Sequence, residues 1–345
     1  MKNFAKKLTA AALAILLSGA FGACSSGGSA SSAIPAGKSG GAQSKAYKSI
    51  GVIEYAVNPS LDNCYTGFMK GLKESGYEKG KNLTIDFQNS QADANNAQTI
   101  AKTMVAKNYD LVMGIATPAA MALYGAANPT KIPTVFTAVG DPVGAGIVKS
   151  LAKPGVNCTG SADILPLESQ LKLIRAFLPH AKKIGVLHTT SEPNSTASLK
   201  TFQRLAPKYG FEVIDVGVTG SSDVEPGMKT LISKKVDCIN NFTDNNVVNH
   251  LPGLLQAANE AKIPIFGSEV EQVKNGCLAT VGIDYVVLGE QTGKMAAKIL
   301  NGTVKAADLS VYTVQDGKPV YNKKVMQQLG ISLPKAYSSA EKIAG

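Results

Sequence analysis

The sequence predicts an α/β protein of two similar lobes, each a parallel sheet flanked by helices, joined by a multi-strand hinge. Two observations support this fold class. Similar phrases recur in the same order in both halves of the chain: Ser49–Ser60 resembles Lys183–Asn194, and Lys131–Phe136 resembles Lys262–Gly267. In addition, each half alternates short runs rich in Ile and Val with stretches that have apolar residues at helical spacing. Such alternation is typical of parallel sheets that are covered by helices on both faces.

The elements of the two halves follow one another in the same order. The first half begins with a strand at 49–55, whose apolar run is almost uninterrupted. Residues 60–76 and 95–108 carry apolar side chains at helical spacing and predict helices that cover the sheet. The other Ile- and Val-rich runs of this half predict strands at 83–88, 111–117 and 132–139. The strands of the second half occupy the matching places, at 183–189, 211–218, 237–243 and 263–268.

A further internal repeat marks the predicted boundary between the two lobes. Gly160–Gln170 resembles Val281–Gln291, and the match aligns Asp163 with Asp284. Each half therefore ends with a strand-like run, an Asp and a helix. If this exit segment crosses to the opposite lobe, more than one strand joins the lobes. The two Asp residues either cap the helices that follow, or face the cleft, or do both. We expect the first lobe to contain 47–158 with 285–310, and the second lobe 159–284 with 311–345.

The N-terminal residues predict export and a lipid anchor. Residues 1–23 have three lysines, then an apolar run, then small residues directly before Cys24, which is the pattern of a signal peptide. Gly22 and Ala23 resemble the end of a bacterial lipoprotein signal, in which the next residue, a cysteine, is lipidated. The alternative is an ordinary secretory signal that is cut nearby. Residues 24–46 are rich in Gly, Ser and Ala and predict a flexible tether.

The charge pattern argues against a nucleic-acid partner. The formal net charge of +10 includes Lys2, Lys6 and Lys7 of the predicted signal, and the remaining excess of +7 is scattered over predicted helices. A nucleic-acid-binding protein would need a basic stripe on one face. A mildly basic surface suits a position near anionic lipid better.

The cysteines and histidines predict neither a cofactor nor a metal site. No CxxC pattern occurs, and the three histidines are far from the spacing of metal ligands. Disulfides are possible in an exported chain, but apolar or small neighbours favour buried free thiols. We expect such thiols at the four cysteines after Cys24, namely Cys64, Cys158, Cys238 and Cys277.

The cleft between the lobes is the predicted ligand site, because open parallel sheets bind ligands at the carboxyl ends of their strands. Thr117–Ala119 begin a helix after a strand, and the free N–H groups of such a first turn can hold a carboxylate. Ser60, or the helix caps at Asn194 and Ser195, would assist. The alternative is an ordinary capped helix without a ligand.

A ligand amino group would need an acidic partner, and several acids follow predicted strands on the side of the cleft. We expect Asp284 to hold this group, with Asp244 or Asp141 next, although such residues are also common in turns and caps. Aromatic residues near the strand ends, such as Tyr55 and Tyr285, pack in the core or stack on a flat ligand. The predicted ligand-binding residues are Tyr55, Asn58, Ser60, Leu61, Thr117, Pro118, Ala119, Asp141, Glu192, Asn194, Ser195, Asp244, Asn245, Glu269 and Asp284.

No enzyme motif occurs in the sequence. There is no glycine-rich phosphate loop between a strand and a helix, and no GxSxG elbow. His188 would be the best general base, yet no nucleophile is paired with it, so an extracellular hydrolase is the weakest alternative. We expect His188 and its counterpart in the first half, Glu54, to lie at the surface or at the rim of the cleft.

Several long sequence segments resemble those of a known protein family. They are found at 116–120, 135–148, 153–160, 243–248 and 282–300. With these phrases, the chain resembles the bacterial ABC-transporter substrate-binding lipoproteins, a family that includes tryptophan-binding members. The resemblance covers nearly all of 48–333. The chain departs from commoner family patterns at Asn58–Ser60 and at Ser268 and Glu269, which are cleft positions.

The resemblance implies a type I periplasmic-binding-protein fold and a protein that is not an enzyme. It implies a monomer on the cell surface or in the periplasm, held to the membrane by a lipid on Cys24. Such a protein delivers a small zwitterionic ligand, here an aromatic amino acid, to an ABC permease with its ATPase. Two alternatives stay open: a ligand sensor for a membrane receptor, and the same clamp binding a nucleoside, sugar or peptide.

Overall fold

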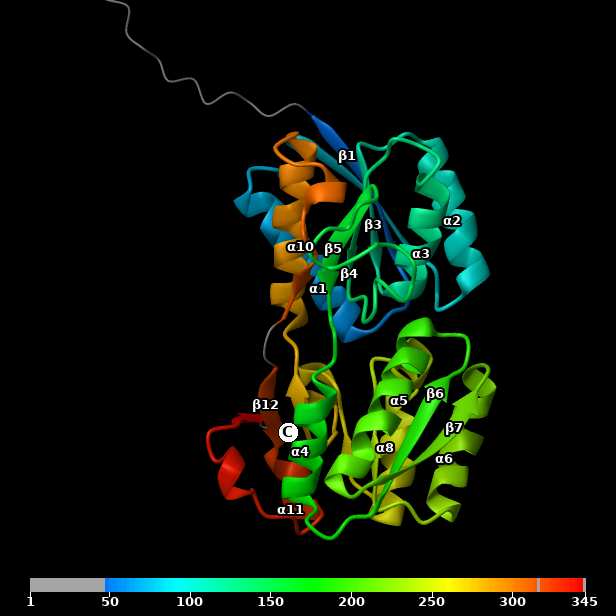
Figure 1. Ribbon diagram of the computed structural model, residues 1–345, viewed down its shortest axis with the longest axis vertical. Helices are drawn as coiled ribbons and strands as arrows, with labels where there is room; N and C mark the ends of the chain where they lie inside the picture. The colour runs from blue at the N-terminus through cyan, green and yellow to red at the C-terminus, as the bar shows by residue number, and fades with distance from the viewer. Residues whose placement is uncertain (1–46, 315–316, 344–345) are drawn as a thin grey trace, which may run out of the picture. The chain divides into compact units, whose positions relative to one another are not determined.

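The computed structural model describes residues 47–314 and 317–343, which belong to one unit of the chain (Figure 1). The predicted signal peptide at 1–23, the lipidation site Cys24 and the predicted tether at 24–46 lie outside the described residues. Among the helices of the described part, none is long and apolar enough to cross a membrane.

The first lobe is built on a parallel sheet with strand order β11-β5-β4-β3-β1-β2. The central strand β1 is buried from Ile50 to Glu54, and Ile50 lies in register with Ile85 of β2 and Leu111 of β3. A strand buried on both faces needs continuous apolar residues, as the sequence has here. The strands are β1 (Lys48–Glu54), β2 (Leu83–Asn89), β3 (Leu111–Ile115), β4 (Thr134–Thr137), β5 (Cys158–Ala162) and β11 (Tyr312–Thr313).

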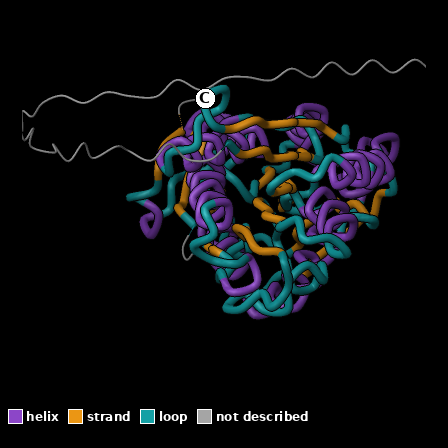
Figure 2. The backbone as a smooth tube through the Cα atoms, turned by 90° about the horizontal axis from the view of Figure 1, so that it is seen from above, coloured by secondary structure: helices purple, strands orange, loops and turns teal. Residues whose placement is uncertain are grey.

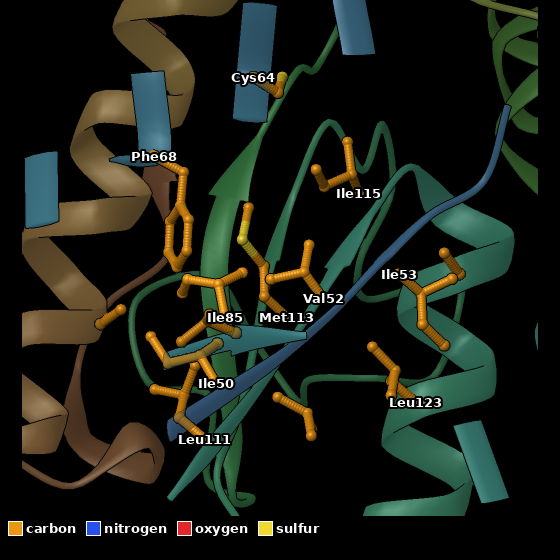
Figure 3. Packing of buried hydrophobic residues seen from close by; sticks show 14 of the residues in the cluster. Ile50, Val52, Ile53, Cys64, Phe68, Ile85, Leu111, Met113, Ile115 and Leu123 are labelled. Atoms are coloured by element: carbon orange, nitrogen blue, oxygen red, sulfur yellow. The ribbon is translucent and has the colours of Figure 1, made fainter. Parts of the chain in front are cut away.

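Helices cover both faces of this sheet. In Figure 1, one pair of helices lies on one side of the strands and a second pair on the other. Figure 3 shows Phe68 close to Met113 and Ile85 on the first side, and Ile53 close to Leu123 on the second. The first pair is α1 (Pro59–Glu74) with α10 (Tyr285–Leu300), and the second is α2 (Ala94–Ala106) with α3 (Thr117–Ala127).

Helices α1 and α10 pack backbone to backbone. A Cβ atom at Gly67 would lie 2.0 Å from the carbonyl oxygen of Val286, and one at Gly289 would lie 2.0 Å from that of Cys64. Only glycine allows so close an approach. This contact fastens α10, which comes from the C-terminal part of the chain, to the first lobe.

The second lobe has a parallel sheet with strand order β7-β6-β8-β9. Figure 2, which looks from above along both lobes, shows helices lying around the strands of the described chain. The strands are β6 (Lys183–Thr189), β7 (Glu212–Val218), β8 (Cys238–Asn240) and β9 (Ile265–Phe266). The helices are α4 (Leu167–Phe177), α5 (Pro193–Leu205), α6 (Val224–Ser233), α7 (Asn245–Asn249), α8 (Leu251–Ala261) and α9 (Val270–Lys274), with short 3-10 turns at Ala206–Tyr209 and Ser221–Asp223.

A separate small sheet, order β10-β12-β13, completes the second lobe and departs from the all-parallel prediction. β10 pairs antiparallel with β12, with Ala279 opposite Tyr321, whereas β12 and β13 are parallel. The C-terminal part of the chain thus returns to pack against this lobe. The elements are β10 (Ala279–Gly282), β12 (Lys318–Asn322), β13 (Glu341–Ile343) and α11 (Lys323–Gln328), with a 3-10 turn at Lys335–Tyr337. The 3-10 turn at Ala306–Asp308 lies beside β5 of the first lobe.

The exit segments of the two halves cross between the lobes. β5 lies in the first sheet, but the helix that follows it, α4, packs Leu171 and Ile174 into the core around β6. β10 lies in the second lobe, but α10 packs on α1. The predicted boundary after residue 158 therefore cuts through β5. The boundary after 310 likewise assigns β11 to the second lobe, whereas Tyr312 pairs with Ser161 of β5 in the sheet of the first lobe.

The cysteines of the described part are free and buried, which confirms the prediction of buried thiols: Cys64, Cys158, Cys238 and Cys277. Burial raises the pKa of each thiol, since a thiolate loses its hydration in an apolar core. These thiols are therefore packing residues and poor nucleophiles at neutral pH.

Candidate ligand-binding site

A pocket lies where the carboxyl ends of the strands from both lobes meet. Its free volume of about 20 Å³ is enough for about one water molecule and far below the roughly 300–1,000 Å³ of small-molecule sites, so a ligand of amino-acid size needs the lobes to move apart. Its position agrees with the rule that open α/β sheets bind ligands beyond their strand ends. The lining residues are Asn58, Ser60, Leu61, Ala116, Ala138, Gly140, Asp163, Asn194, Thr243, Asn245, Val248, Glu269 and Tyr285.

Asp163 is the most exceptional group of the pocket. It is 2% exposed, and the hydroxyl of Tyr285 donates to its Oδ2 at 2.6 Å. Its other oxygen, Oδ1, is buried and has no hydrogen-bond partner among the described residues. Burial raises the pKa of Asp163 to about 6, although the bond from Tyr285 lowers it in part. A buried carboxylate oxygen without a partner needs a donor, which a ligand can supply.

Glu269 is a second buried carboxylate in the same pocket. It is 3% exposed, and Nε2 of Gln272 donates to its Oε1 at 3.2 Å. Burial raises the pKa of Glu269 to about 7, and the nearby hydroxyl of Ser60 and amide of Gln272 oppose this rise. None of the described lining residues is a Lys or Arg. The pocket therefore favours a ligand with a cationic group.

The helix starts around the pocket carry groups that favour an anionic part of a ligand. Asn58 caps α1, because its Oδ1 accepts from the backbone N–H of Leu61 at 3.0 Å. The hydroxyls of Thr117, at the start of α3, and Ser195, in the first turn of α5, are buried without a partner in the described part of the chain. Hydroxyls and first-turn N–H groups suit an anion such as a carboxylate.

The first lobe contributes strained backbone to the pocket. Ala116 and Ala138 follow β3 and β4 with φ of +76° and +55°, a region that residues other than glycine rarely adopt. Such conformations cost about 1–3 kcal/mol each and cluster at functional sites. With Gly140, these residues form a wall of small side chains along the pocket.

Glu192 and Asp244 form a polar layer behind the pocket. Glu192 accepts from the backbone N–H of Asn245 at 3.0 Å and of Asn246 at 3.1 Å. Asp244 accepts from the backbone N–H and the hydroxyl of Thr189 at 2.6 and 2.8 Å. Burial raises the pKa of Glu192, and the neighbouring Asp244 raises it further. Both carboxylates are thus engaged within the second lobe and do not line the pocket.

The structure brings six of the predicted ligand-binding residues to the pocket wall: Asn58, Ser60, Leu61, Asn194, Asn245 and Glu269. Thr117, Pro118, Ala119 and Ser195 lie at the helix starts beside it. α3 begins at Thr117 as expected, with Ala116 at the capping position and no side chain capping the helix. Tyr55 is a packing residue, since its buried hydroxyl donates to the carbonyl oxygen of Ala92 at 2.9 Å.

Two acids predicted to hold an amino group lie elsewhere. Asp284 is exposed, caps α10 by accepting from the N–H groups of Val286 and Val287, and lines a separate hollow of about 690 Å³. Asp141 is exposed and accepts from the N–H of Gly144 within its own turn. Both carboxylates are needed by nearby N–H groups, so the amino group is better matched by Asp163.

Glu54 and His188 are not surface or rim residues, contrary to expectation. Glu54 is 2% and His188 is 7% exposed. Glu54 accepts from Nδ2 of Asn89 at 2.9 Å, and burial raises its pKa to about 7. Glu54 is the last residue of β1, and His188 is the last but one of β6. Their burial removes the geometric basis for His188 as an accessible general base.

Sequence reasoning considered Asp163 and Tyr285 but did not select them for the site. The internal repeat aligned Asp163 with Asp284 and gave no reason to prefer Asp163 over Asp284 as a ligand-binding residue. The asymmetry comes from the crossing segments: Tyr285 begins α10 and reaches Asp163, whereas Asp284 points to its own helix. The small residues Ala138 and Gly140 follow a strand at the point where the two halves of the chain stop resembling each other. This difference between the halves was the only sequence signal for them.

Comparisons with known proteins agree with this geometry. Residues 49–342 match the family described as ABC transporter substrate binding protein. A tyrosine-binding protein of Clostridioides difficile (strain R20291) is 41% identical over 287 residues, which are 83% of this chain and 82% of the relative.

Two solved structures are similar over most of the chain. The ABC domain from Streptococcus pneumoniae in complex with L-Trp is 38% identical, with a TM-score of 0.83, and the match covers 87% of this chain and 100% of that one. A ligand-free, open structure of a substrate-binding protein with adhesive properties from Clostridium difficile is 39% identical, with a TM-score of 0.66, covering 86% and 99%. The two-lobed fold is that of type I periplasmic binding proteins. The chain therefore belongs to the family of ABC transporter substrate-binding proteins.

Proposed function

We propose that this protein captures an aromatic amino acid between its two lobes and delivers it to an ABC importer, from outside the cytoplasm and anchored by a lipid on Cys24. The observation that carries the ligand class is the pocket around Asp163. A zwitterion has a cationic and an anionic end, and the pocket has separate groups that complement each of them.

The ammonium group lies at Asp163 in this proposal, with Glu269 nearby. Asp163 Oδ1 is buried without a partner among the described residues, so an ammonium group would complete its hydrogen bonding. An ion pair in a water-poor site gains strength, because the effective dielectric constant is low. The raised pKa of both acids supports this assignment, since a bound cation would offset the cost of their ionisation.

The ligand carboxylate lies at the first turn of α3, where Thr117 and Ala119 begin the helix. The unpartnered hydroxyl of Thr117 and the helix N-terminus both favour an anion. Ser60, at the start of α1, lines the pocket and is available as a further donor.

The side chain of the ligand lies against the apolar part of the wall. Leu61, Val248 and Tyr285 supply apolar and aromatic surface, while Ala138 and Gly140 leave space. The relatives named for tyrosine and L-Trp support an aromatic amino acid. Family membership supports the permease and ATPase as partners, and the N-terminal sequence supports the lipid anchor.

The test is to identify the natural ligand and then its two polar contacts. Mass spectrometry of small molecules released from the denatured, purified protein should detect an aromatic amino acid. Calorimetry should show binding of tryptophan, tyrosine or phenylalanine, and much weaker binding of analogues without the amino or the carboxyl group. Binding of a nucleoside, sugar or peptide with indifference to all three amino acids would refute the ligand class.

Delivery by a two-lobed clamp makes a second measurement useful. Because groups from both lobes line the pocket, ligand should shift the population toward an arrangement in which the lobes enclose it. Small-angle scattering should then give a smaller radius of gyration with saturating ligand. An unchanged profile in the presence of proven binding would exclude closure.

A further inference from the structure

We propose that Glu192 is a positioning residue that fixes the side-chain amide of Asn194. In this orientation the amide oxygen of Asn194, and not its nitrogen, faces the ligand, and it shares the ligand's ammonium group with Asp163. The inference rests on the proposed function and deepens it, because it assigns a selectivity role to a residue that does not touch the ligand.

The amide orientation of Asn194 follows from its neighbours. Its Nδ2 donates to the carbonyl oxygen of Thr243 at 3.0 Å and lies 3.4 Å from Oε2 of Glu192. Both neighbours are acceptors, so a flipped amide would set oxygen against oxygen. The side chain of Asn194 is therefore held with Oδ1 on the other side. Asn194 is 6% exposed, lines the pocket, and its buried Oδ1 has no partner among the described residues.

Glu192 organises this wall because it accepts several hydrogen bonds at once. Its Oε2 accepts from Nδ2 of Asn245 at 2.7 Å and from the backbone N–H of the same residue at 3.0 Å. Its Oε1 accepts from the backbone N–H of Asn246 at 3.1 Å. The amide nitrogens of two pocket-lining asparagines thus point away from the ligand. Both oxygens of Glu192 accept hydrogen bonds here, which the amide of a glutamine in its place could not reproduce, since one end of an amide only donates.

Asp163 and Asn194 approach the same point in the pocket. A Cβ atom placed on Gly140 would lie 3.9 Å from Oδ1 of Asp163 and 3.8 Å from Cβ of Asn194. Gly140 therefore lies beside both side chains and adds no side chain of its own. In the proposed complex, an ammonium group beside Gly140 donates to both unpartnered oxygens. The amino group then lies on the side of α5, whereas Asn194 was expected to assist the carboxylate.

The experiment compares tryptophan with indole-3-propionate, which lacks the amino group, and with tryptamine, which lacks the carboxyl group. The chain contains no tryptophan, so the indole fluorescence of the probe reports binding without background. Glu192→Gln should weaken tryptophan binding by about tenfold or more, because a hydrogen bond to a charged group is lost. The affinity for indole-3-propionate should fall far less, so the ratio of the affinities for tryptophan and indole-3-propionate should decrease. The preference for the carboxyl group, measured with tryptamine, should stay.

Two further variants complete the design. Asn194→Ala removes the proposed acceptor without touching Glu192 and should narrow the amine preference in the same way. It decides the question if circular dichroism shows that Glu192→Gln does not fold. Glu225→Gln makes the same chemical change at an exposed position of the second lobe and should leave all three affinities unchanged.

The outcomes separate this inference from the proposed function. If Glu192→Gln and Asn194→Ala weaken tryptophan and indole-3-propionate equally, Glu192 only supports the fold and the inference is overturned. If the wild-type protein itself does not prefer tryptophan over indole-3-propionate, the proposed function fails first.

Discussion

Asp163→Asn is the sharpest perturbation of the site, because it removes a charge and leaves the shape almost unchanged. Asn can still accept from the hydroxyl of Tyr285, which donates to Asp163 at 2.6 Å. The nitrogen of the new amide would replace Oδ1, the oxygen that faces the pocket without a partner among the described residues. The variant should therefore fold, bind zwitterions poorly and respond differently to pH.

The stability effect can be worked from the raised pKa. Burial raises the pKa of Asp163 from 3.8 to about 6, so the folded, ligand-free protein holds this proton more tightly than the unfolded chain. Asp163 therefore destabilises the fold as pH rises from about 3.8 to 6, by about 3 kcal/mol in all. Asn has no such titration. The stability difference between variant and wild type should shift in favour of the variant by about 2 kcal/mol between pH 4.5 and 8.

The binding effect has the opposite sign. Losing a charged hydrogen bond, about 1.5–3 kcal/mol, should weaken tryptophan binding about tenfold to a hundredfold at pH 8. In the wild type, affinity should fall as pH drops through about 6, because Asp163 takes up a proton and no longer pairs with the ammonium group. In Asp163→Asn this part of the pH dependence should disappear.

The assays are probe fluorescence for affinity and circular dichroism for thermal unfolding, each at pH 4.5 and 8. Asp141→Asn is the matched control, since it makes the same change at an exposed turn. Unchanged tryptophan affinity in Asp163→Asn would refute the assignment of the ammonium group. A stability difference that does not vary with pH would refute the account of the buried carboxylate.

Three other perturbations test the packing, the clamp and the anchor. Gly289→Ala should destabilise the fold by about 1–3 kcal/mol, because its Cβ would lie 2.0 Å from a carbonyl oxygen of α1, whereas Gly125→Ala, which meets nothing within 4 Å, should stabilise it slightly; thermal unfolding measures both. Asn63→Ala removes a 3.1 Å hydrogen bond to Glu271 between the lobes and should weaken tryptophan binding about threefold to tenfold by calorimetry. Cys24→Ala should move the protein from the membrane to the soluble fraction with unaltered affinity, and retention on salt-washed membranes would count against the lipid anchor.

Local patterns predicted four strands of each parallel sheet, namely β1 to β4 and β6 to β9. The strand predicted at 183–189 is β6, and the helix predicted at 60–76 is α1 to within two residues at each end. Burial on both faces of a parallel sheet demands continuous apolar runs, and helices that cover such a sheet demand apolar residues at helical spacing. The internal repeat predicted the two lobes, since similar sequence patterns form similar sheets.

The contacts between the two lobes could not be predicted from local sequence patterns and were decided by the tertiary structure. Asp163 and Asp284 occupy the same place in the repeat, yet one faces the pocket beside Tyr285 and the other caps α10. The small antiparallel sheet and the place of β11 were also beyond local patterns, because their partners are far away in the sequence. A repeat specifies the same local conformation twice. Which copy becomes buried, and which groups it meets, depends on the segments that cross between the lobes and pack there.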